Sequence, residues 1–542
     1  MLKLLIYRLL RYEYLNQLFS LLIFIFKLNS KDKNKLKYYL KKFSNLNFEN
    51  KETNLCLFNN LFSIKSFETI SFYIFILNIF KLNNFSPAIF SSFKFYSLIK
   101  ASKIKAMPPL LSYNKFLKIK NPTFSSLSDI KNYKWKKISC GIFALSSTFR
   151  ELKTQQFDIN SPIHIKILNK NLNKSIQYVD SFFNFLKIHQ NVKAAVFSDP
   201  GYVGQGEMFE ILTNKNIPCY QFYMSIDENK MIFKKYLKNN QKEHFDKISN
   251  KNWKKIISNS KKNNQIKNSV KNIKKLYIKN SWFPSVGTTR DEKFFSKKKI
   301  YDILQIDKQK PIAVIFNHIF WDGTFFYGED LFLTYREWFI ETIKAAYKNR
   351  NLNWIIKPHP ANKVQNSRYG INETITEEEK IIKKTFGHVP KNFRILKNNN
   401  KINSWSLYQV LDYCLTVRGT PGIESAMFGA ETIIAGSGRY ENRGFTKYFT
   451  DKNSYLKYLS NLKNFVKKNK SKIKYATLYA ENVFFKKPLK LDSISVKFKK
   501  NKTADMDLKI KFNTLEEFKK KKDILKLKNW IEFGEQEFFL ND

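Results

Sequence analysis

Short apolar runs alternate with helix-length segments between residues 300 and 450, and this alternation limits the chain to few folds. The runs have the length of buried strands: PIAVIFNH, NWIIKPHP, VLDYCLTVRG and ETIIAG. Between the first two lies LFLTYREWFIETIKAAYK, whose apolar residues recur at three- and four-residue steps, as on one face of a helix. PGIESAMFG is a shorter helix between the last two runs. Strands and helices that alternate in this order predict a parallel sheet covered by helices.

A second strand–helix–strand unit precedes this region. KAAVFSD predicts a short buried strand, PGYVGQG a loop, EMFEILTNK a helix and IPCYQFY the next strand. The Lys- and Asn-rich stretch from about 230 to 280 predicts surface helices that connect the two units. The predicted fold class is therefore α/β, with two parallel-sheet domains joined by a linker.

The glycine-free N-terminal part predicts a different structure. Many of its apolar runs have helical length, so we expect residues 1–130 to form a mostly helical appendage. LFSLLIFIF and ISFYIFILNIF are too short to cross a membrane as a helix, which takes about 20 apolar residues. They are either buried helices or a membrane contact that lies in the interface. The other predicted domains are a first parallel-sheet domain with the Lys- and Asn-rich connection at 131–290, a second parallel-sheet domain at 291–480, and a C-terminal tail with a late helix at 481–542.

Glycine is scarce in this chain, with 16 residues, and most of it gathers in two short stretches. Gly201, Gly204 and Gly206 lie in PGYVGQG, and six glycines lie between Gly419 and Gly444. Both stretches follow predicted strands, and parallel sheets bind ligands at the carboxyl ends of their strands. Glycines at these places either let the backbone approach a ligand or serve tight turns only.

The sequence RGTPG predicts a phosphate site in the second glycine stretch. Thr420 and the proline after it suit the N-cap and first position of a helix, whose first N–H groups attract anions. Gly419 and Gly422 would let a phosphate come close. Arg418 enters this turn and Arg439 comes from the next loop, although the chain has only 11 arginines beside 85 lysines. Arginines placed in this way favour fork-shaped recognition of a diphosphate.

Two further strand ends supply candidate residues. In IIKPHP, two prolines fix the loop around His359, and Lys357 ends the strand. An imidazole at this place could donate a hydrogen bond to a phosphate oxygen. NHIFWDG adds His318 and Asp322 at the cleft.

These segments resemble those of a known family. KPHP, TVRGTPGIESAMFG and AGSGRYENRGFT are similar to segments of bacterial glycosyltransferases that build capsule and surface polysaccharides. Those enzymes are of the two-Rossmann GT-B type, so the resemblance implies an α/β fold with two Rossmann-like parallel-sheet domains that face a cleft. They are related to Kdo transferases and, more distantly, to CDP-glycerol glycerophosphotransferases. The resemblance covers residues 193–446 and reaches neither end of the chain.

The resemblance implies roles in donor binding. His359 and Glu424 would hold the nucleotide, with Glu424 accepting hydrogen bonds from the ribose hydroxyls. Arg418, Arg439 and the backbone of Thr420–Gly422 would take the phosphates. No DxD motif lies near the glycine loops, so we expect transfer without a metal ion, with side chains that neutralise the leaving group. No cofactor is expected beyond the nucleotide-sugar donor.

Transfer to an acceptor hydroxyl needs a general base within hydrogen-bond reach. Asp199 and Glu207, at the first glycine stretch, are candidates for this catalytic role, and His318 is another. Alternatively, Asp199 caps a turn and Glu207 caps the helix that follows.

Charge and cysteine content bear on location. The formal net charge of +51 comes mainly from lysine. A genome with A/T-rich codons would give many lysines in any protein. Alternatively, the charge serves to attract an anionic membrane or an acidic glycan. The four widely spaced cysteines predict buried thiols in a reducing cytoplasm. We expect a cytoplasmic protein peripheral to the inner face of the cytoplasmic membrane, with no specific nucleic-acid partner.

The predicted function is a glycosyltransferase that moves a sugar from a nucleotide-activated donor to a growing capsule or lipopolysaccharide glycan. The acceptor would be lipid-linked or an oligosaccharide. A nucleotide-sugar epimerase and a polyol-phosphate transferase on the same scaffold are the alternatives among enzymes. A non-catalytic basic protein that binds glycan or nucleic acid is the alternative from another class, and steep salt dependence would mark nucleic-acid binding.

Overall fold

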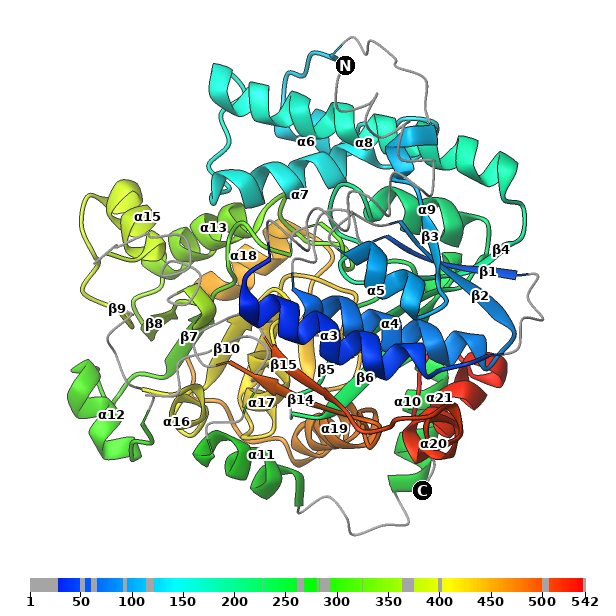
Figure 1. The fold of residues 1–542 in the computed structure, drawn as a ribbon. Coiled ribbons are helices and arrows are strands. Elements are labelled where there is room, and N and C mark those ends of the chain that lie inside the picture. The colour runs from blue at the N-terminus through cyan, green and yellow to red at the C-terminus, as the bar shows by residue number, and fades with distance from the viewer. Residues whose placement is uncertain are drawn as a thin grey trace.

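Two sheets with related strand orders form the core of the molecule (Figure 1). The computed structural model describes residues 28–48, 54–59, 66–90, 95–113, 121–226, 228–260, 268–279, 282, 293–323, 325–362, 375–397, 402–499 and 506–539. In each sheet, the first three strands run outward to one side, and the strands that follow continue on the other side of the first strand. This 3-2-1-4-5-6 order is that of the Rossmann fold.

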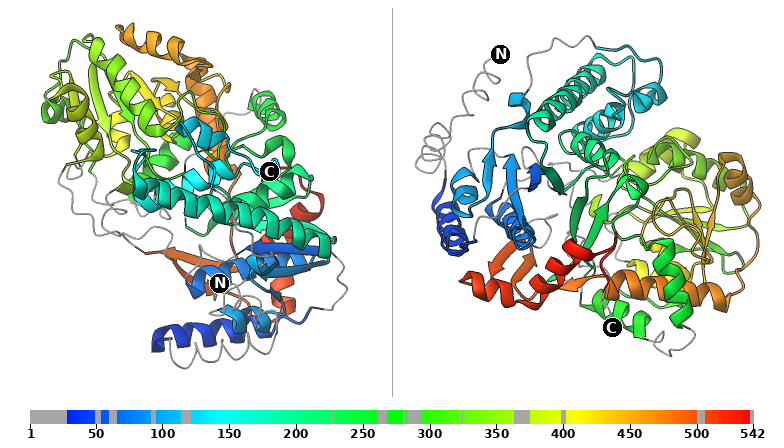
Figure 2. Two further views of the ribbon diagram at one scale, coloured as in Figure 1. Left: turned by 90° about the horizontal axis from the view of Figure 1, so that it is seen from above. Right: turned by 90° about the vertical axis from the view of Figure 1, so that its right-hand side faces the viewer.

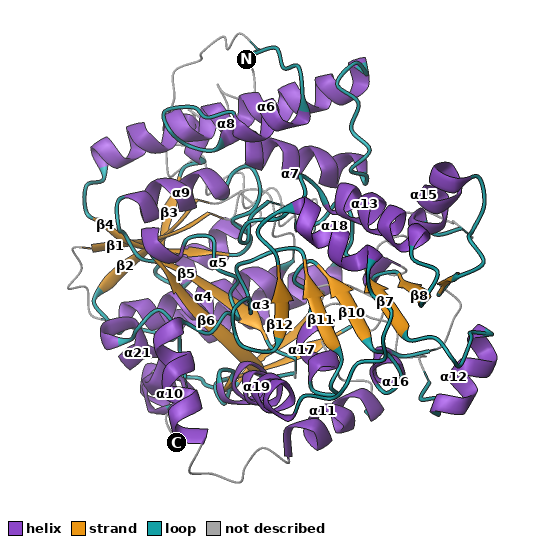
Figure 3. Ribbon diagram, turned by 180° about the vertical axis from the view of Figure 1, so that it is seen from behind, coloured by secondary structure: helices purple, strands orange, loops and turns teal. Residues whose placement is uncertain are grey.

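The second sheet has six parallel strands in the order β12-β11-β10-β7-β8-β9. Its central strands are buried along their whole length, because helices cover both faces (Figure 3). The alternation predicted for this region is confirmed. The strands are β7 (Ile312–Phe316), β8 (Asn353–Lys357), β9 (Phe393–Ile395), β10 (Tyr413–Thr416), β11 (Glu431–Ile434) and β12 (Thr446–Tyr448), and the helices are α12 (Lys297–Leu304), α13 (Tyr335–Lys348), α15 (Glu377–Phe386), α16 (Ser404–Tyr408), α17 (Pro421–Ala426) and α18 (Lys452–Ser460).

The first sheet has seven strands in the order β13-β6-β5-β4-β1-β2-β3. Strands β1 to β5 are parallel, β6 runs antiparallel to β5, and β13 runs antiparallel to β6. The prediction of two Rossmann-like parallel-sheet domains is therefore confirmed. The strands are β1 (Asn54–Asn59), β2 (Phe85–Phe90), β3 (Lys105–Met107), β4 (Val192–Phe197), β5 (Cys219–Met224), β6 (Lys230–Tyr236) and β13 (Leu489–Lys490), with α9 (Gly206–Asn214) between β4 and β5.

The first three strands of this sheet come from the range for which a helical appendage was expected. Helices make up most of the regular structure in the described part of residues 1–130, as expected, but the expectation of an appendage is wrong, because β1, β2 and β3 belong to the first sheet. The turn before β2 bends at Asn84 (φ 58°) and the turn before β3 at Lys103 (φ 51°), in the left-handed region that glycine favours. Because no glycine marks these loops, the short apolar strands resemble parts of helical runs.

Helix α4 (Phe67–Lys81) contains the apolar run ISFYIFILNIF. Fourteen of its 15 residues are buried, and it packs against β2, β15 (Met506–Ile510) and α21 (Lys522–Phe533). The interpretation of this run as a buried helix is confirmed. Because the helix is buried on all sides, it has no exposed face that could contact a membrane. The run LFSLLIFIF lies outside the described residues. Among the helices that the structure describes, none combines the length and apolar character needed to span a bilayer.

Helices dominate the segment between β3 and β4. It contains α6 (Leu127–Asn132), α7 (Cys140–Leu152) and the 27-residue α8 (Pro162–Ile188), which pack against the first sheet. On the other side of that sheet lie α3 (Ser30–Ser44), α4 and α5 (Tyr96–Ala101). The helices of the N-terminal part therefore form two layers, one on each face of the first sheet.

The C-terminal region belongs to the first domain and forms no separate tail. After α19 (Lys470–Glu481) and the π-helical turn η6 (Asn482–Lys486), the chain returns to pair β13 with β6. Strand β14 (Ile494–Phe498) pairs with β15, and their apolar side chains join those of α4 in one core. Figure 2 shows these C-terminal elements, in red, beside the N-terminal elements in blue. The predicted late helix is present as α20 (Leu515–Lys520) and α21.

The Lys- and Asn-rich connection forms helices α10 (Asn250–Ser260) and α11 (Asn268–Ile278), as predicted, whereas its first residues form strand β6. Each has one apolar face, and Trp253 and Ile273 are buried in a core shared with α17 and α19. The four cysteines are free and buried, also as predicted.

Candidate functional site

The strand order fixes where the second sheet can bind a ligand. Because the order reverses between β7 and β10, the loops that leave these strands diverge to opposite faces and open a crevice. The loop after β7 begins at Asn317 and the loop after β10 at Val417. Strand β8 pairs with β7 and ends at Lys357. The polar residues at these three strand ends are therefore brought to one edge of the sheet.

A cavity of about 420 Å³ lies at this crevice. Its walls come from the strand-end loops of the second sheet, from the segment after β6, and from α11. Three of the six histidines of the chain line it, namely His244, His318 and His359. Of the other residues predicted for the site, the cavity brings together Lys357, Arg418, Gly419, Thr420, Glu424 and Arg439, whereas Gly422, Asp199 and Glu207 lie outside its lining.

His318 lies at the point where the strand order reverses. Its Nε2 accepts the N–H of Val417 (3.3 Å) and lies 3.2 Å from Thr416 Oγ1, while the ring stacks on Tyr335. Burial, reinforced by His359 when that ring is protonated and by the guanidinium groups of Arg418 and Arg439, lowers the pKa of His318 well below its usual range. Because Nε2 accepts, the proton of the neutral ring sits on Nδ1. His318 thus ties two strand ends together and keeps one N–H donor.

His359 is a second neutral imidazole at the cavity. Its Nδ1 accepts the N–H of Ala361 (3.2 Å), which places the ring proton on Nε2. Burial lowers the pKa of His359 to about 4; Asp322 opposes this shift and Lys357 adds to it. Lys357 is itself buried and donates to the carbonyl oxygen of Ile402 (3.1 Å). An anionic ligand would therefore meet imidazole N–H groups and one ammonium group here.

Arg418 and Arg439 are neutralised by carboxylates of the protein. Arg418 pairs with Asp330, and Arg439 pairs with both carboxylate oxygens of Asp246. Arg439 also donates to the carbonyl oxygen of Arg418 (2.8 Å). The two arginines are 4% and 6% exposed and line the cavity. Since their charges are already matched, their main effect is to fix the loop after β10.

The glycine loop before α17 is braced by its own hydrogen bonds. The N–H of Gly422 donates to the carbonyl oxygen of Gly419 (3.0 Å). Helix α17 begins at Pro421, as predicted, but Thr420 makes no side-chain cap hydrogen bond. A Cβ atom at position 422 would overlap the hydroxyl of Tyr440, which donates to the carbonyl oxygen of Gly419 (2.6 Å). Glycine at position 422 therefore permits close packing of two loops.

Glu424 faces the cavity from the first turn of α17. It is 2% exposed, and its Oε2 accepts the hydroxyl of Tyr277 in α11 (2.6 Å). Burial raises the pKa of Glu424 to about 7, although the hydrogen bond from Tyr277 opposes the shift. Tyr277 stacks on Trp282 with 5.1 Å between ring centroids. The carboxyl group thus lies beside an aromatic wall, which suits a ligand that is flat and polar at its edge.

The first-domain candidates have structural partners. Asp199 pairs with Arg150 (3.2 Å), which also pairs with Asp322 (2.5 Å), and only Asp322 of these three lines the cavity. Glu207 is fully buried in the first turn of α9 and accepts the N–H of Gly204 (2.7 Å). This is the capping contact weighed for Glu207 as the alternative to catalysis.

Four residues of the site were missed from the sequence: His244 and Tyr277 line the cavity, and Asp246 and Asp330 pair with arginines that line it. His244 and Asp246 lie in EHFDK, inside the stretch assigned to surface helices, and their spacing in a polar loop was the available signal. Asp330 and Tyr277 gave no signal in the sequence. Asp330 lies 88 residues from its partner Arg418, and Tyr277 lies 147 residues from its partner Glu424. Within the described part of the chain, no group of three or more His, Cys, Asp or Glu side chains is suited to hold a metal ion.

Comparison of the chain with family models and with curated proteins gives no match. Among solved structures, it is similar to KpsC of Thermosulfurimonas dismutans, a β-Kdo 2,4 transferase, with 11% identity over 61% of this chain and 88% of that one (TM-score 0.31). It is also similar to UDP-GlcNAc 2-epimerase of Neisseria meningitidis, bound to UDP-GlcNAc, with 12% identity over 78% and 96% (TM-score 0.25).

A third similar structure is that of Anabaena HepE in complex with UDP and glucose. The identity is 9% over 79% of this chain and 94% of that one, with a TM-score of 0.27. At these scores the likeness says nothing about the site. The two Rossmann-like sheets are established by the strand order of this chain.

Proposed function

We propose that the protein is a glycosyltransferase that takes its sugar from a nucleotide-activated donor and holds the nucleotide in the cavity between β7 and β10. The observation that carries this proposal is the cavity at the switch point of the second sheet, which is the place between β7 and β10 where the strand order reverses. Sheets with the Rossmann strand order bind nucleotides at this place. Its volume of about 420 Å³ lies within the range typical of small-molecule sites.

The phosphates of the donor would lie against the strand ends of β7 and β8. Lys357, His359 and His318 can each donate an N–H there, as their positions at the cavity support. When the sugar–phosphate bond breaks, negative charge develops on the leaving phosphate. Fixed N–H donors stabilise that charge without reorganising, so transfer needs no metal ion in this proposal.

The nucleoside would lie toward α17 and α11. Glu424 can accept a hydrogen bond from a ribose hydroxyl, since Tyr277 engages one of its two oxygens. The stacked rings of Tyr277 and Trp282 offer an apolar surface to the base. Arg418 and Arg439 hold the loop between these two parts in place.

The acceptor in this proposal is a growing capsule or lipopolysaccharide glycan, lipid-linked or as an oligosaccharide. The formal net charge of +51 supports a location at the inner face of the cytoplasmic membrane, because a positive surface attracts anionic lipids and acidic glycans. Co-sedimentation with vesicles of phosphatidylglycerol, compared with phosphatidylcholine, tests this location independently of the enzyme activity.

Calorimetric titration with CMP, CDP, UDP, GDP and ADP tests the donor site. We expect one nucleotide to bind selectively. His359→Ala should weaken its binding roughly tenfold or more, because a hydrogen bond to a charged group is worth about 1.5–3 kcal/mol. His388→Ala is the matched control, since His388 is exposed and lies outside the cavity. Equal, weak binding of all five nucleotides that fades with salt and is unchanged in His359→Ala would overturn the proposal.

A further inference from the structure

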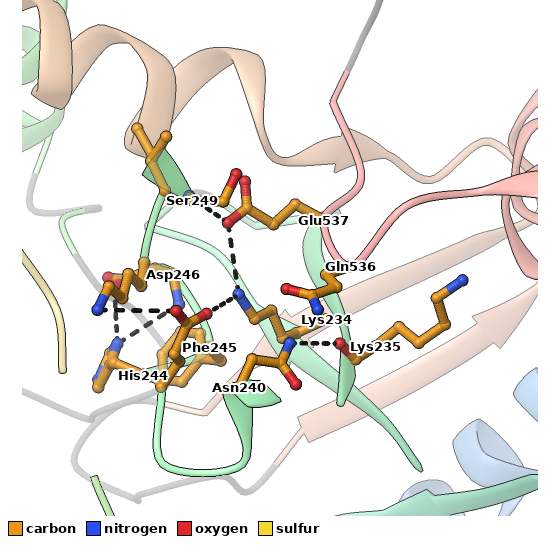
Figure 4. Close-up of polar contacts among 12 residues, drawn as sticks. Lys234, Lys235, Asn240, His244, Phe245, Asp246, Ser249, Gln536 and Glu537 are labelled. Carbon is orange, nitrogen blue, oxygen red and sulfur yellow. Dashed lines mark hydrogen bonds and ion pairs between the residues drawn. The ribbon is translucent and has the colours of Figure 1, made fainter. Parts of the chain in front are cut away.

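His244 and Asp246 form a hydrogen-bonded pair at the cavity, in the segment between β6 and α10. His244 Nδ1 lies 2.6 Å from Asp246 Oδ1 (Figure 4). The imidazole contacts two aromatic rings, with centroid distances of 4.2 Å to Phe245 and 4.6 Å to Tyr327. His244 lines the cavity, and its side chain is 12% exposed. One ring nitrogen is therefore fixed by a carboxylate, and the ring is held in one orientation.

The protonation of this pair follows from its surroundings. Burial alone would raise the pKa of Asp246, but the Arg439 guanidinium and His244 outweigh it and hold that pKa well below its usual range. The carboxylate can then only accept, so His244 Nδ1 carries the proton. Burial lowers the pKa of His244 to about 4, against the attraction of Asp246, so the ring is neutral at pH 7. A neutral imidazole with its proton on Nδ1 has a lone pair on Nε2.

The segment that carries the pair is braced from both domains. The N–H of His244 donates to the carbonyl oxygen of Gly438 in the second domain (2.8 Å). From the first domain, the fully buried Glu537 accepts the N–H of Ser249 (2.5 Å) and pairs with Lys234 in β6 (3.4 Å), as Figure 4 shows. Lys487 donates to the carbonyl oxygen of Phe245 (3.0 Å). Such bracing keeps a reacting group in one position.

We propose that His244 is the general base of the transfer reaction, with Asp246 as its positioning partner. This inference rests on the proposed function. His244 Nε2 takes the proton of the acceptor hydroxyl while that oxygen bonds to the anomeric carbon. The bond from the anomeric carbon to the donor phosphate breaks, and its electron pair leaves with the nucleotide. Asp246 stabilises the imidazolium, which then loses its proton to water.

Two observations favour His244 over the carboxylates considered from the sequence. Asp199 and Glu207 lie outside the cavity lining, whereas His244 belongs to it. His244 also follows a strand of the first sheet, so it reaches the cavity from the domain opposite the proposed nucleotide site. A bound nucleotide phosphate adds negative charge near the ring, which favours the imidazolium and strengthens the base.

Donor hydrolysis tests the inference without knowledge of the acceptor, because water can take the place of the acceptor hydroxyl. The probes are UDP-glucose, UDP-N-acetylglucosamine, GDP-mannose, ADP-glucose and CMP-N-acetylneuraminate, and release of the nucleotide is measured. His244→Ala should hydrolyse the probe that the wild type accepts about 10²- to 10⁴-fold more slowly, with nucleotide affinity unchanged. Added imidazole should restore part of the rate in His244→Ala. His244→Gln, which fills the space and can still donate to Asp246, should be slow and gain nothing from imidazole.

The outcomes distinguish a failure of the general-base proposal from a failure of the proposed nucleotide site. A wild-type rate in His244→Ala with normal nucleotide binding would overturn the base and leave the proposed function standing. Loss of nucleotide binding together with hydrolysis in both variants, without rescue, would also overturn it, because His244 would then be structural. If the wild type binds none of the nucleotides, the proposed function and the base both fail.

Discussion

The two sheets share a strand order, yet their switch points differ. Between β7 and β10 of the second sheet, the crevice opens into a cavity of about 420 Å³. Between β1 and β4 of the first sheet, described side chains make contacts at the corresponding place. Asn59, the last residue of β1, donates to the carbonyl oxygen of Gly204 in the loop after β4. Phe326 of the second domain packs against Gly201 in the same loop.

This contrast indicates that strand order determines where a site can form, and that the side chains beyond the strands determine whether it stays open. The loop after β7 places Phe325 against Phe149 and Phe326 against Phe209, so aromatic rings of the second domain pack against helices α7 and α9 of the first. We therefore expect substitutions at the first switch point to change stability, and substitutions at the second to change nucleotide binding.

Arg439→Ala should have the largest effect on stability, because it removes one partner of a buried ion pair. Asp246, 4% exposed in its side chain, would keep an unmatched charge, which costs about 3–5 kcal/mol. Urea unfolding measures the loss. Lys452→Ala is the control, since its pair with Glu337 is 47% and 35% exposed and should be worth less than about 1 kcal/mol. Equal losses in the two variants would show that the pair beneath the cavity contributes no more than a surface pair.

Glu207→Gln should change how stability depends on pH. Burial raises the pKa of Glu207 to about 7, above the 4.5 of a free side chain, so the folded protein binds this proton more tightly than the unfolded chain. The wild type therefore loses stability as pH rises from about 4.5 through 7. Glutamine has no such loss, and the variant should gain on the wild type by up to about 3 kcal/mol between pH 5 and pH 8.

Urea unfolding at both pH values measures this gain, with nucleotide affinity followed beside it. Glu516→Gln, whose side chain is 69% exposed, is the control and should show no gain. A difference between Glu207→Gln and the wild type that is the same at pH 5 and pH 8 would contradict the prediction. A loss of nucleotide affinity in Glu207→Gln would show that the first switch point takes part in binding after all.

Alanine substitution at one glycine of each switch point makes a matched pair. At position 419, a Cβ would lie 2.9 Å from Thr416 Oγ1 and 3.8 Å from the His318 ring, so it should disturb the cavity and weaken nucleotide binding about tenfold, or 1.4 kcal/mol. At position 201, a Cβ would lie 3.3 Å from Phe326 Cβ and should cost about 1 kcal/mol of stability without changing affinity. If both variants lose affinity equally, the two switch points do not differ as we infer.

The second sheet could be predicted from the sequence, and part of the first could not. Prolines and glycines punctuate the apolar runs after residue 300, so strand ends were visible at KPHP and RGTPG. In the N-terminal part, Asn84 and Lys103 take the left-handed turn positions instead of glycine. The segment with α6 to α8 then separates β3 from β4, which hides that β1 and β4 are neighbours.

For the site, the sequence shows which residues lie at the ends of strands, but not which side chains pair with them. His318, His359 and Arg418 could be placed together because they follow strands of one sheet. The partner of Arg439, Asp246, lies 193 residues away in a stretch rich in Lys and Asn. Such a pairing is a tertiary contact without a local pattern, and it gives an arginine expected to bind phosphate a carboxylate partner within the protein.

The smallest effect is expected from the ion pairs that join the two switch points. Arg150 contacts Asp199 at 3.2 Å and Asp322 at 2.5 Å, with side chains 39%, 42% and 27% exposed. Because water screens these charges, Arg150→Ala should lose less than about 1 kcal/mol, and the loss should fade in 1 M salt, where the Debye length is about 3 Å. Arg150→Lys, which keeps the charge, should lose less still. A loss above about 2 kcal/mol that persists in salt would mean that these charges, and not the aromatic rings of the β7 loop, keep the first switch point covered.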